Sequence, residues 1–224
     1  MGGAERSDGI DPAPSAVIAA QGGLRAAVFL DRDGVIIENK ETYVTAWEDV
    51  QFIPGALEAV RWVSQTEFAV VVVTNQAAIA RGLITLDDAV ELNRRVMAVV
   101  TAHGGRIDGC YLCPHGPGDG CDCRKPAPGM LLAAATDLDL DLEASWLIGD
   151  AVTDAVAAVR AGCRPVMVRT RRGESQSALM PTHLQTQVPV LPDLAAAVDY
   201  VTSETARTDR QTVVSDRPLP TENA

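Results

Sequence analysis

The sequence has no long hydrophobic run and little positive charge. No apolar stretch approaches the ~18 residues that span a membrane. The first residues, MGGAERSDGIDPAPSAVIAAQGG, lack a basic start followed by an apolar stretch of signal-peptide length. Lys and Arg number 19 against 30 Asp and Glu, giving a formal net charge of -11, so attraction to nucleic acid or to an anionic membrane is not expected. We therefore expect a cytoplasmic monomer that holds any anionic small-molecule substrate with local groups.

Composition and length indicate one globular domain with a core. The chain has 224 residues, of which 47% are hydrophobic and 22% are charged. Residues 1–22 and 203–224 are rich in Ser, Thr, Pro, Asp and Gly without periodicity, so both are expected to be flexible tails. The domain is therefore expected to occupy residues 23–202.

Short β-branched runs alternate with stretches of helical periodicity, which is typical of a parallel sheet covered by helices. The sequence predicts an α/β, doubly wound, Rossmann-like parallel sheet. The predicted strands are 25–30, 68–73, 107–112, 145–149 and 165–169. The predicted helices are 54–65, 85–104 and 151–162, the second with Thr85 as N-cap and Asp88 in the capping-box position. Residues 35–53 exceed a usual βα connection and are expected to form a small flap or hairpin.

Ligands of such sheets bind beyond the carboxyl ends of the strands, so the residues that follow each strand are the candidate site. Asp31 and Asp33 stand two positions apart in FLDRDGVI. They suit a plain strand-to-turn transition, or a pair of carboxylates that share one Mg²⁺. A calcium loop fits poorly, because Gly34 comes fourth where the EF-hand pattern has glycine sixth.

Three other strand ends carry polar groups, and each has an ordinary alternative. Thr74 and Asn75 can donate to a phosphate, or can form a turn. Arg124 and Lys125 can bind an anion, or can be a solvated surface pair. Asp150 can bind a metal, or can cap a helix.

Four of the five cysteines lie in one short segment, CYLCPHGPGDGCDC. Cys113, His115, Cys121 and Cys123 form a Cys₃His set that suits a closed tetrahedral Zn²⁺ site better than a disulfide framework. The alternative is a chance cluster of reduced thiols. Cys110 and Cys163 are expected in the core. A zinc ion here would order the loop that delivers Arg124 and Lys125.

The motifs occur in the order D-x-D-G, T-N, K-P and G-D-x-x-x-D, and in this order the chain resembles the haloacid-dehalogenase-like phosphohydrolases over about residues 25–170. The resemblance implies that fold, with a minimal cap and a zinc-binding loop. It implies Asp31 as nucleophile and Asp33 as general acid and base. Thr74 and Lys125 would stabilise the transferring phosphoryl group. The Mg²⁺ ligands would be Asp31, Asp33 through its backbone carbonyl, and Asp150.

Within that superfamily, TNQAAIARG, the zinc loop and CRKPAPGM resemble the heptose-1,7-bisphosphate 7-phosphatases. That resemblance implies removal of the 7-phosphate and implies substrate contacts at several positions. The chain departs from the family's pattern at Ile37, at Ala77-Ala78 and at Ala151, which leaves the sugar and its anomer open. The expected substrate contacts are Arg32, Asn39, Tyr43, Asn75, Gln76 and Arg124.

Other functions use similar residues. A histidinol-phosphate phosphatase, or another phosphatase of small esters, shares the catalytic set. A DNA 3′-phosphatase shares DRDG, but the acidic charge and the lack of a G-x-x-x-x-G-K-[ST] motif argue against it. A receiver-like phospho-acceptor or a zinc-organised binding module would use such residues without turnover.

Overall fold

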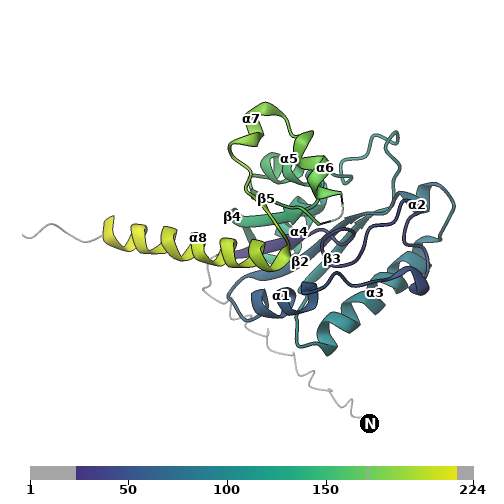
Figure 1. Cartoon of the computed structure of the whole chain (residues 1–224), viewed down its shortest axis with the longest axis horizontal. Coiled ribbons are helices and arrows are strands. Elements are labelled where there is room, and N and C mark those ends of the chain that lie inside the picture. Colours follow the sequence, from purple (N-terminus) through teal and green to yellow (C-terminus); the bar gives the residue numbers. More distant parts are fainter. Residues whose placement is uncertain (1–23, 171, 216–224) are drawn as a thin grey trace, which may run out of the picture.

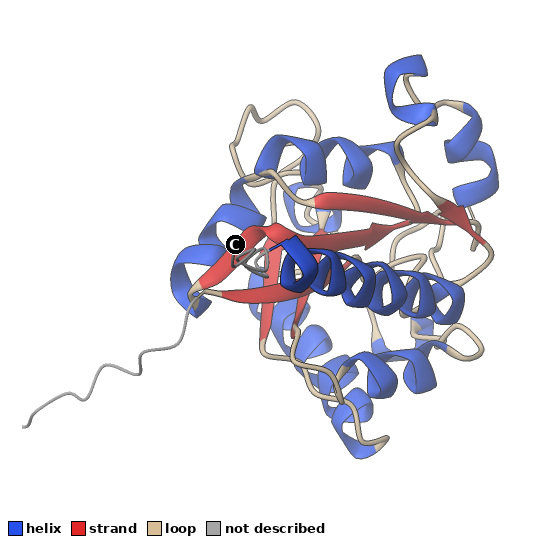
Figure 2. Cartoon of the chain, turned by 90° about the vertical axis from the view of Figure 1, so that its left-hand side faces the viewer, coloured by secondary structure: helices blue, strands red, loops and turns tan. Residues whose placement is uncertain are grey.

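The computed structural model describes residues 24–170 and 172–215, and these residues form one parallel sheet covered by helices on both faces (Figures 1 and 2). The sheet has the strand order β3-β2-β1-β4-β5-β6. The chain thus starts at the centre with β1, adds β2 and β3 on one side, and then adds β4, β5 and β6 on the other side. The predicted doubly wound α/β class is confirmed. The strands are β1 (Arg25–Leu30), β2 (Ala69–Asn75), β3 (Gly109–Cys113), β4 (Leu140–Gly149), β5 (Arg164–Val168) and β6 (Val190–Leu191).

The helices divide between the two faces of the sheet. The first face carries α1 (Ala56–Val63), α3 (Leu86–Ala102) and α8 (Leu194–Ser215), and the second carries α4 (Gly129–Leu138) and α5 (Val152–Ala161) (Figure 1). The shorter elements are η1 (Trp47–Asp49), α2 (Ala77–Ala80), α6 (Gly173–Ala178) and α7 (Thr182–Gln185). No helix in the described ranges combines the length and the apolar character needed to cross a bilayer.

Alternating side chains of the central strands build two cores. In β1, Val28 and Leu30 join the core under α1, α3 and α8, whereas Ala27 and Phe29 join the core under α4 and α5. Successive side chains of a strand point to opposite faces, so a strand covered on both sides is apolar throughout. This explains why the apolar runs of β1 and β2 carry no polar alternation.

Local signals located the elements better than their ends. Thr85 caps α3 as predicted, because its hydroxyl accepts the backbone N–H of Asp88 at 3.1 Å. β4 begins at Leu140, five positions before the predicted start at 145. The pairing of β4 with β1 is irregular between Ala26 and Val28, and the polar residues beside this irregularity hid the first half of the strand.

The flap between β1 and α1 is tied at its base. Ile37 pairs antiparallel with Phe52, and the backbone N–H of Glu38 donates to the carbonyl of Gln51 at 2.7 Å. At its far end the carboxylate of Asp49 accepts from Lys40 at 2.8 Å. The flap is thus a short hairpin-like excursion that stands beside the carboxyl end of the sheet, as a minimal cap.

Two expectations require correction. Cys110 is exposed, because β3 is an edge strand with one open flank, whereas Cys163 is buried as predicted. The chain is also helical beyond residue 202, since α8 continues to Ser215. That stretch contains no Gly or Pro, and Arg207 pairs with Glu204 at 2.6 Å along the helix. The expected tail at 1–22 and the last part of the expected C-terminal tail, 216–224, lie outside the described residues.

Candidate active site

The carboxylate of Asp31 lies directly after β1 at the carboxyl edge of the sheet. Its Oδ1 accepts the backbone N–H of Arg32 at 2.7 Å and lies 3.0 Å from Nζ of Lys125. Asp31 forms a buried cluster with Asp150 and Asp154, in which one oxygen of each carboxylate lies within 4.8 Å of the others. Residues from β1, from the end of β4 and from α5 therefore meet at one point, as the strand-end argument predicted for Asp31 and Asp150.

Lys125 lies inside this cluster with almost no exposure. Its ammonium lies 2.7 Å from Asp154 Oδ1 and donates to the carbonyl of Val73 at 2.7 Å. Burial lowers the pKa of Lys125, but the opposing charges of Asp154 and Asp31 outweigh it and the pKa is raised. The amide of Asn75 clamps the backbone of Lys125, donating to its carbonyl and accepting from its N–H, both at 3.0 Å. Lys125 is thus held as a cation beside Asp31.

Asp150 is fully buried beside two other carboxylates. Burial and the nearby Asp31 raise the pKa of Asp150 to about 8, although Arg172 opposes the shift. Nε of Arg172 donates to both carboxylate oxygens of Asp150, at 3.0 and 2.9 Å. The backbone of Gly34, at φ +90°, approaches so closely that a Cβ there would clash with Asp150 Oδ2. Glycine in DRDG is therefore required by contact as well as by conformation.

The donor set fits Mg²⁺. Among the described residues, three buried carboxylates face two cations, Lys125 and Arg172, which leaves one negative charge in excess. Hard oxygen ligands and an uncompensated charge are what Mg²⁺ prefers in proteins. Asp31 and Asp150 are the side chains that would hold it, as the resemblance to the haloacid-dehalogenase-like phosphohydrolases implies. Asp154 is bound to Lys125 and to the backbone N–H of Ala151.

Asp33 faces away from the carboxylate cluster. Its carboxylate accepts from the Arg32 guanidinium at 3.1 and 2.9 Å and from Gln76 Nε2 at 3.0 Å. Gln76 also donates to the hydroxyl of Thr74 at 2.8 Å, so Thr74, Gln76 and Asp33 form one chain of hydrogen bonds. The Asp33 side chain is outside the acidic cluster, so only its backbone carbonyl could take the metal-ligand role that the resemblance implies for Asp33, and this role stays a prediction.

Arg32 does not meet the expectation of a substrate contact. Its side chain is completely buried, it is absent from the described lining of the cavity, and its NH1 donates to Asn93 Oδ1 at 2.6 Å. A guanidinium is kept in the core here because two acceptors, Asp33 and Asn93, satisfy most of its donors. The hydrogen bonds from Arg32 therefore orient the carboxylate of Asp33.

Asn93 is therefore expected to stabilise the fold through Arg32. Asn93→Ala leaves a buried guanidinium donor without its acceptor, which costs ~1–3 kcal/mol of unfolding free energy. Urea denaturation monitored by circular dichroism measures this loss. Val90→Ala on the half-exposed face of the same helix is the matched control, with an expected change below ~0.5 kcal/mol. Equal stability of the two variants would contradict this role of the Arg32–Asn93 pair.

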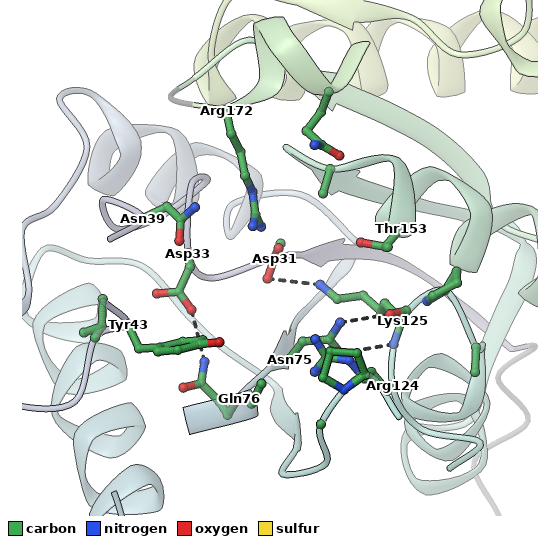
Figure 3. Close-up of a pocket in the computed structure, with 18 of the residues that line it drawn as sticks. Asp31, Asp33, Asn39, Tyr43, Asn75, Gln76, Arg124, Lys125, Thr153 and Arg172 are labelled. Carbon is green, nitrogen blue, oxygen red and sulfur yellow. Dashed lines mark hydrogen bonds and ion pairs between the residues drawn. The ribbon is translucent and has the colours of Figure 1, made fainter. Parts of the chain in front are cut away.

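A cavity of about 770 Å³ opens above the acidic cluster, and Figure 3 shows the side chains that surround it. Asn39 and Tyr43 border it from the flap, and the guanidinium of Arg81 lies 5.5 Å from the centre of the Tyr43 ring. Arg124 borders it opposite the flap, with NH1 donating to the carbonyl of His115 at 2.9 Å. Of the predicted site residues, those that line the cavity are Asp31, Asp33, Asn39, Tyr43, Asn75, Gln76, Cys121, Arg124 and Lys125.

The Cys₃His set converges as predicted. The Sγ of Cys123 lies 3.2 Å from that of Cys113 and 3.5 Å from that of Cys121, and 3.3 Å from Nδ1 of His115. In tetrahedral zinc with Zn–S bonds of ~2.3 Å, ligand atoms are ~3.8 Å apart, so the spacing suits one Zn²⁺. The five cysteines are free thiols. The cluster directly precedes Arg124 and Lys125 and is compatible with a closed structural zinc site.

Sequence reasoning missed Arg172 and Asn93 and underrated Asp154. Asp154 was visible in the G-D-x-x-x-D motif, but its pairing with Lys125 requires the fold. Asn93 stands on the buried side of α3, where a polar residue among apolar neighbours was an available signal. Arg172 is one of several arginines after β5, and no pattern distinguishes it.

Comparison with known proteins agrees with this geometry. Residues 122–197 match the model of the HAD-hydrolase-like family. Curated relatives named D-glycero-β-D-manno-heptose-1,7-bisphosphate 7-phosphatase include the Pseudomonas putida protein, 42% identical over 66% of this chain and 84% of the relative. The Bordetella bronchiseptica protein is 36% identical over 79% of this chain and 98% of the relative.

Solved structures give the same result. The B. bronchiseptica D,D-heptose 1,7-bisphosphate phosphatase, complexed with magnesium and phosphate, is 35% identical with a TM-score of 0.74, over 80% of this chain and 99% of that chain. The Burkholderia thailandensis D,D-heptose 1,7-bisphosphate phosphatase is 28% identical with a TM-score of 0.60, over 79% of this chain and 99% of that chain. The chain is thus an enzyme of the haloacid-dehalogenase-like phosphatases and belongs to the D-glycero-β-D-manno-heptose-1,7-bisphosphate 7-phosphatase family.

Proposed function

We propose that this protein is a Mg²⁺-dependent phosphatase that removes the 7-phosphate of D-glycero-D-manno-heptose 1,7-bisphosphate through an aspartyl-phosphate. The observation that carries the proposal is the meeting of Asp31, Asp150 and Lys125 beneath one cavity, which Asp31 and Lys125 line. The names of the relatives, and the magnesium and phosphate bound to the B. bronchiseptica enzyme, support the substrate class and the metal.

In this proposal Asp31 attacks phosphorus with its Oδ2. The other oxygen, Oδ1, is held by the N–H of Arg32 and by Lys125, which fixes the direction of the free oxygen. Uncatalysed hydrolysis of phosphate monoesters is so slow that enhancements up to ~10²¹-fold are needed, and a covalent intermediate divides the barrier into two steps. Lys125 places positive charge beside the phosphoryl oxygens. Mg²⁺, when bound, would neutralise negative charge on the phosphoryl oxygens.

Asp33 is proposed to protonate the leaving alkoxide and then to take a proton from the water that cleaves the aspartyl-phosphate. Its carboxylate accepts three hydrogen bonds, two from Arg32 and one from Gln76. As acid, Asp33 must give up part of this network and turn toward the leaving group. Gln76 donates to both Asp33 and Thr74, so a rotation of Asp33 would also change the hydrogen bonding of Thr74.

Substrate selection is proposed to lie in the outer wall of the cavity. In this proposal Asn39 and Tyr43 on the flap contact sugar hydroxyls, and Arg124 holds the phosphate that is not cleaved. Their position in the lining of the cavity supports these roles. Arg124 is anchored by one nitrogen to the carbonyl of His115, which leaves the rest of its planar fork for an anion. The zinc proposed at the Cys₃His cluster would fix that carbonyl in place.

A substrate panel tests the proposal. Purified protein with Mg²⁺ is given both anomers of the heptose 1,7-bisphosphate, fructose 1,6-bisphosphate, histidinol phosphate and a 3′-phosphorylated oligonucleotide, and phosphate release is measured. The heptose bisphosphate is expected to give a kcat/KM at least ~10²-fold above the other compounds, because the outer wall is proposed to select the sugar. Histidinol phosphate as the best substrate would move the protein to the alternative small-ester class, and no turnover of any compound would favour a binding module.

Three further expectations stay predictions. We propose that the protein acts as a monomer in the cytoplasm, without nucleic-acid partners, on the basis of its acidic composition and its small-molecule cavity. Size-exclusion chromatography with light scattering measures the oligomeric state.

A further inference from the structure

In the part of the chain that the structure describes, Arg172 is the cation of the carboxylate cluster that the sequence motifs do not account for. It stands between β5 and α6, and Figure 3 shows its side chain extending from the α6 side toward Asp31 and into the cavity. The segment that carries it is fixed to the rest of the site. The hydroxyl of Thr170 donates to the carbonyl of Gly34, and a Cβ on Gly173 would clash with the carbonyl of Val168. Arg172 is thus presented by a closely packed turn.

The guanidinium is only partly used by its carboxylate partner. Nε donates to both oxygens of Asp150, and among the described residues Asp150 is the acceptor of its hydrogen bonds. Arginine has five N–H donors in a planar fork, so the terminal nitrogens remain available for an anion. The side chain is 42% exposed, whereas Asp150 is not exposed at all, so the open part of the fork faces the cavity.

The same contact occupies the carboxylate that a metal would use. Arg172 engages both oxygens of Asp150, and Mg²⁺ bound there must take at least one of them. Once Asp150 is shared with a divalent cation, its attraction for the guanidinium falls. A phosphoryl group above Asp31 then becomes the strongest nearby anion for Arg172.

We propose that Arg172 binds the phosphoryl group in the Mg²⁺-loaded enzyme and takes the place of Mg²⁺ on Asp150 in the metal-free enzyme. Arg172 is thereby a third positive group, besides Lys125 and the metal, on the phosphate that is transferred. The inference rests on the proposed function, because it takes the cavity floor as the phosphate site. It assigns a substrate-contacting role to a residue outside the four motifs.

Two titrations on the full chain test this, with Arg172→Gln as the variant and isothermal titration calorimetry as the measurement. Inorganic phosphate added at saturating Mg²⁺ is expected to bind ~10- to 100-fold more weakly to Arg172→Gln, as for a lost charge-assisted hydrogen bond. Mg²⁺ added without phosphate is expected to bind about 10-fold more tightly, because a competing cation has left Asp150. The two shifts have opposite signs.

Arg169→Gln is the matched control. It removes the same charge three positions earlier, from a 55% exposed side chain paired with Glu174, and is expected to change neither affinity by more than ~2-fold. Arg172→Lys, which keeps the charge, is a second variant and is expected to bind phosphate more tightly than Arg172→Gln. Circular dichroism checks that each variant is folded.

Unchanged phosphate affinity in Arg172→Gln would overturn the phosphate contact, and weaker Mg²⁺ binding would overturn the competition for Asp150. Neither titration contains a sugar. They can therefore fail while heptose bisphosphate is still hydrolysed, and they can succeed while another phosphate ester proves to be the substrate. The failure of this inference and the failure of the proposed function are thus distinguishable.

Discussion

Asp31→Asn is expected to lower turnover by on the order of 10⁴- to 10⁶-fold, the scale seen when a catalytic nucleophile is removed. An amide oxygen is neutral and does not form the aspartyl-phosphate, although it occupies the same volume beside Lys125 and can still accept a hydrogen bond. Phosphate release from the preferred compound of the panel measures the loss.

The same variant is expected to remain folded. Among the described residues, Asp31 is one of three carboxylates that face two cations. Its neutralisation removes the excess negative charge of this cluster, which offsets the loss of its ion pair with Lys125. Thermal unfolding is expected within a few degrees of the wild type. Asp199→Asn, on an exposed position of α8, is the control and should retain full activity. Residual turnover above about one per cent in Asp31→Asn would exclude Asp31 as the nucleophile.

Cys121→Ser is expected to produce the second large effect, on metal content and on activity together. Zinc binding contributes folding free energy directly. Without the metal, the short Gly- and Pro-rich loop before Arg124 and Lys125 would lose the interaction that orders it. We expect about one zinc ion per chain in the wild type and well below half of that in the variant. Inductively coupled plasma mass spectrometry measures the zinc content. Turnover is expected to fall at least ~10-fold, because Lys125 is no longer held in a fixed position beside Asp31.

Cys110→Ser is the matched control for this experiment. Cys110 is the exposed thiol of β3, three positions before Cys113 and outside the Cys₃His cluster. Its replacement should leave zinc content and turnover unchanged. Full activity of a zinc-free Cys121→Ser protein would show that the loop is ordered by its packing alone.

The parts of the site that were predictable are those written within a few residues of a buried strand. FLDRDG, the Thr74-Asn75 pair and Asp150 each follow an apolar run, and parallel strands bring their carboxyl ends to one edge, so local patterns implied a tertiary site. The Cys₃His segment was likewise predictable, because three cysteines and a histidine within eleven residues indicate a metal site whatever the fold of the loop.

The unpredicted parts depend on distance in three dimensions. The burial of Arg32 follows from its pairing with Asn93, 61 positions away, and an arginine beside two aspartates otherwise resembles a surface residue. Cys110 was misjudged because the sequence does not say which strand forms the edge of the sheet. The helical continuation of α8 was missed because polar composition was taken as flexibility, although Trp146 donates to Thr205 at 3.3 Å and ties that stretch to β4.

The ammonium of Lys125 has three protons and three acceptors: the carbonyl of Val73 and the carboxylates of Asp31 and Asp154. It is saturated before any substrate arrives, so it cannot reorient to suit the shape of a particular molecule. The floor of the site thus treats every phosphate ester alike. New substrate preferences can therefore evolve by exchange of side chains on the flap and at Arg124, while the inner machinery is inherited unchanged.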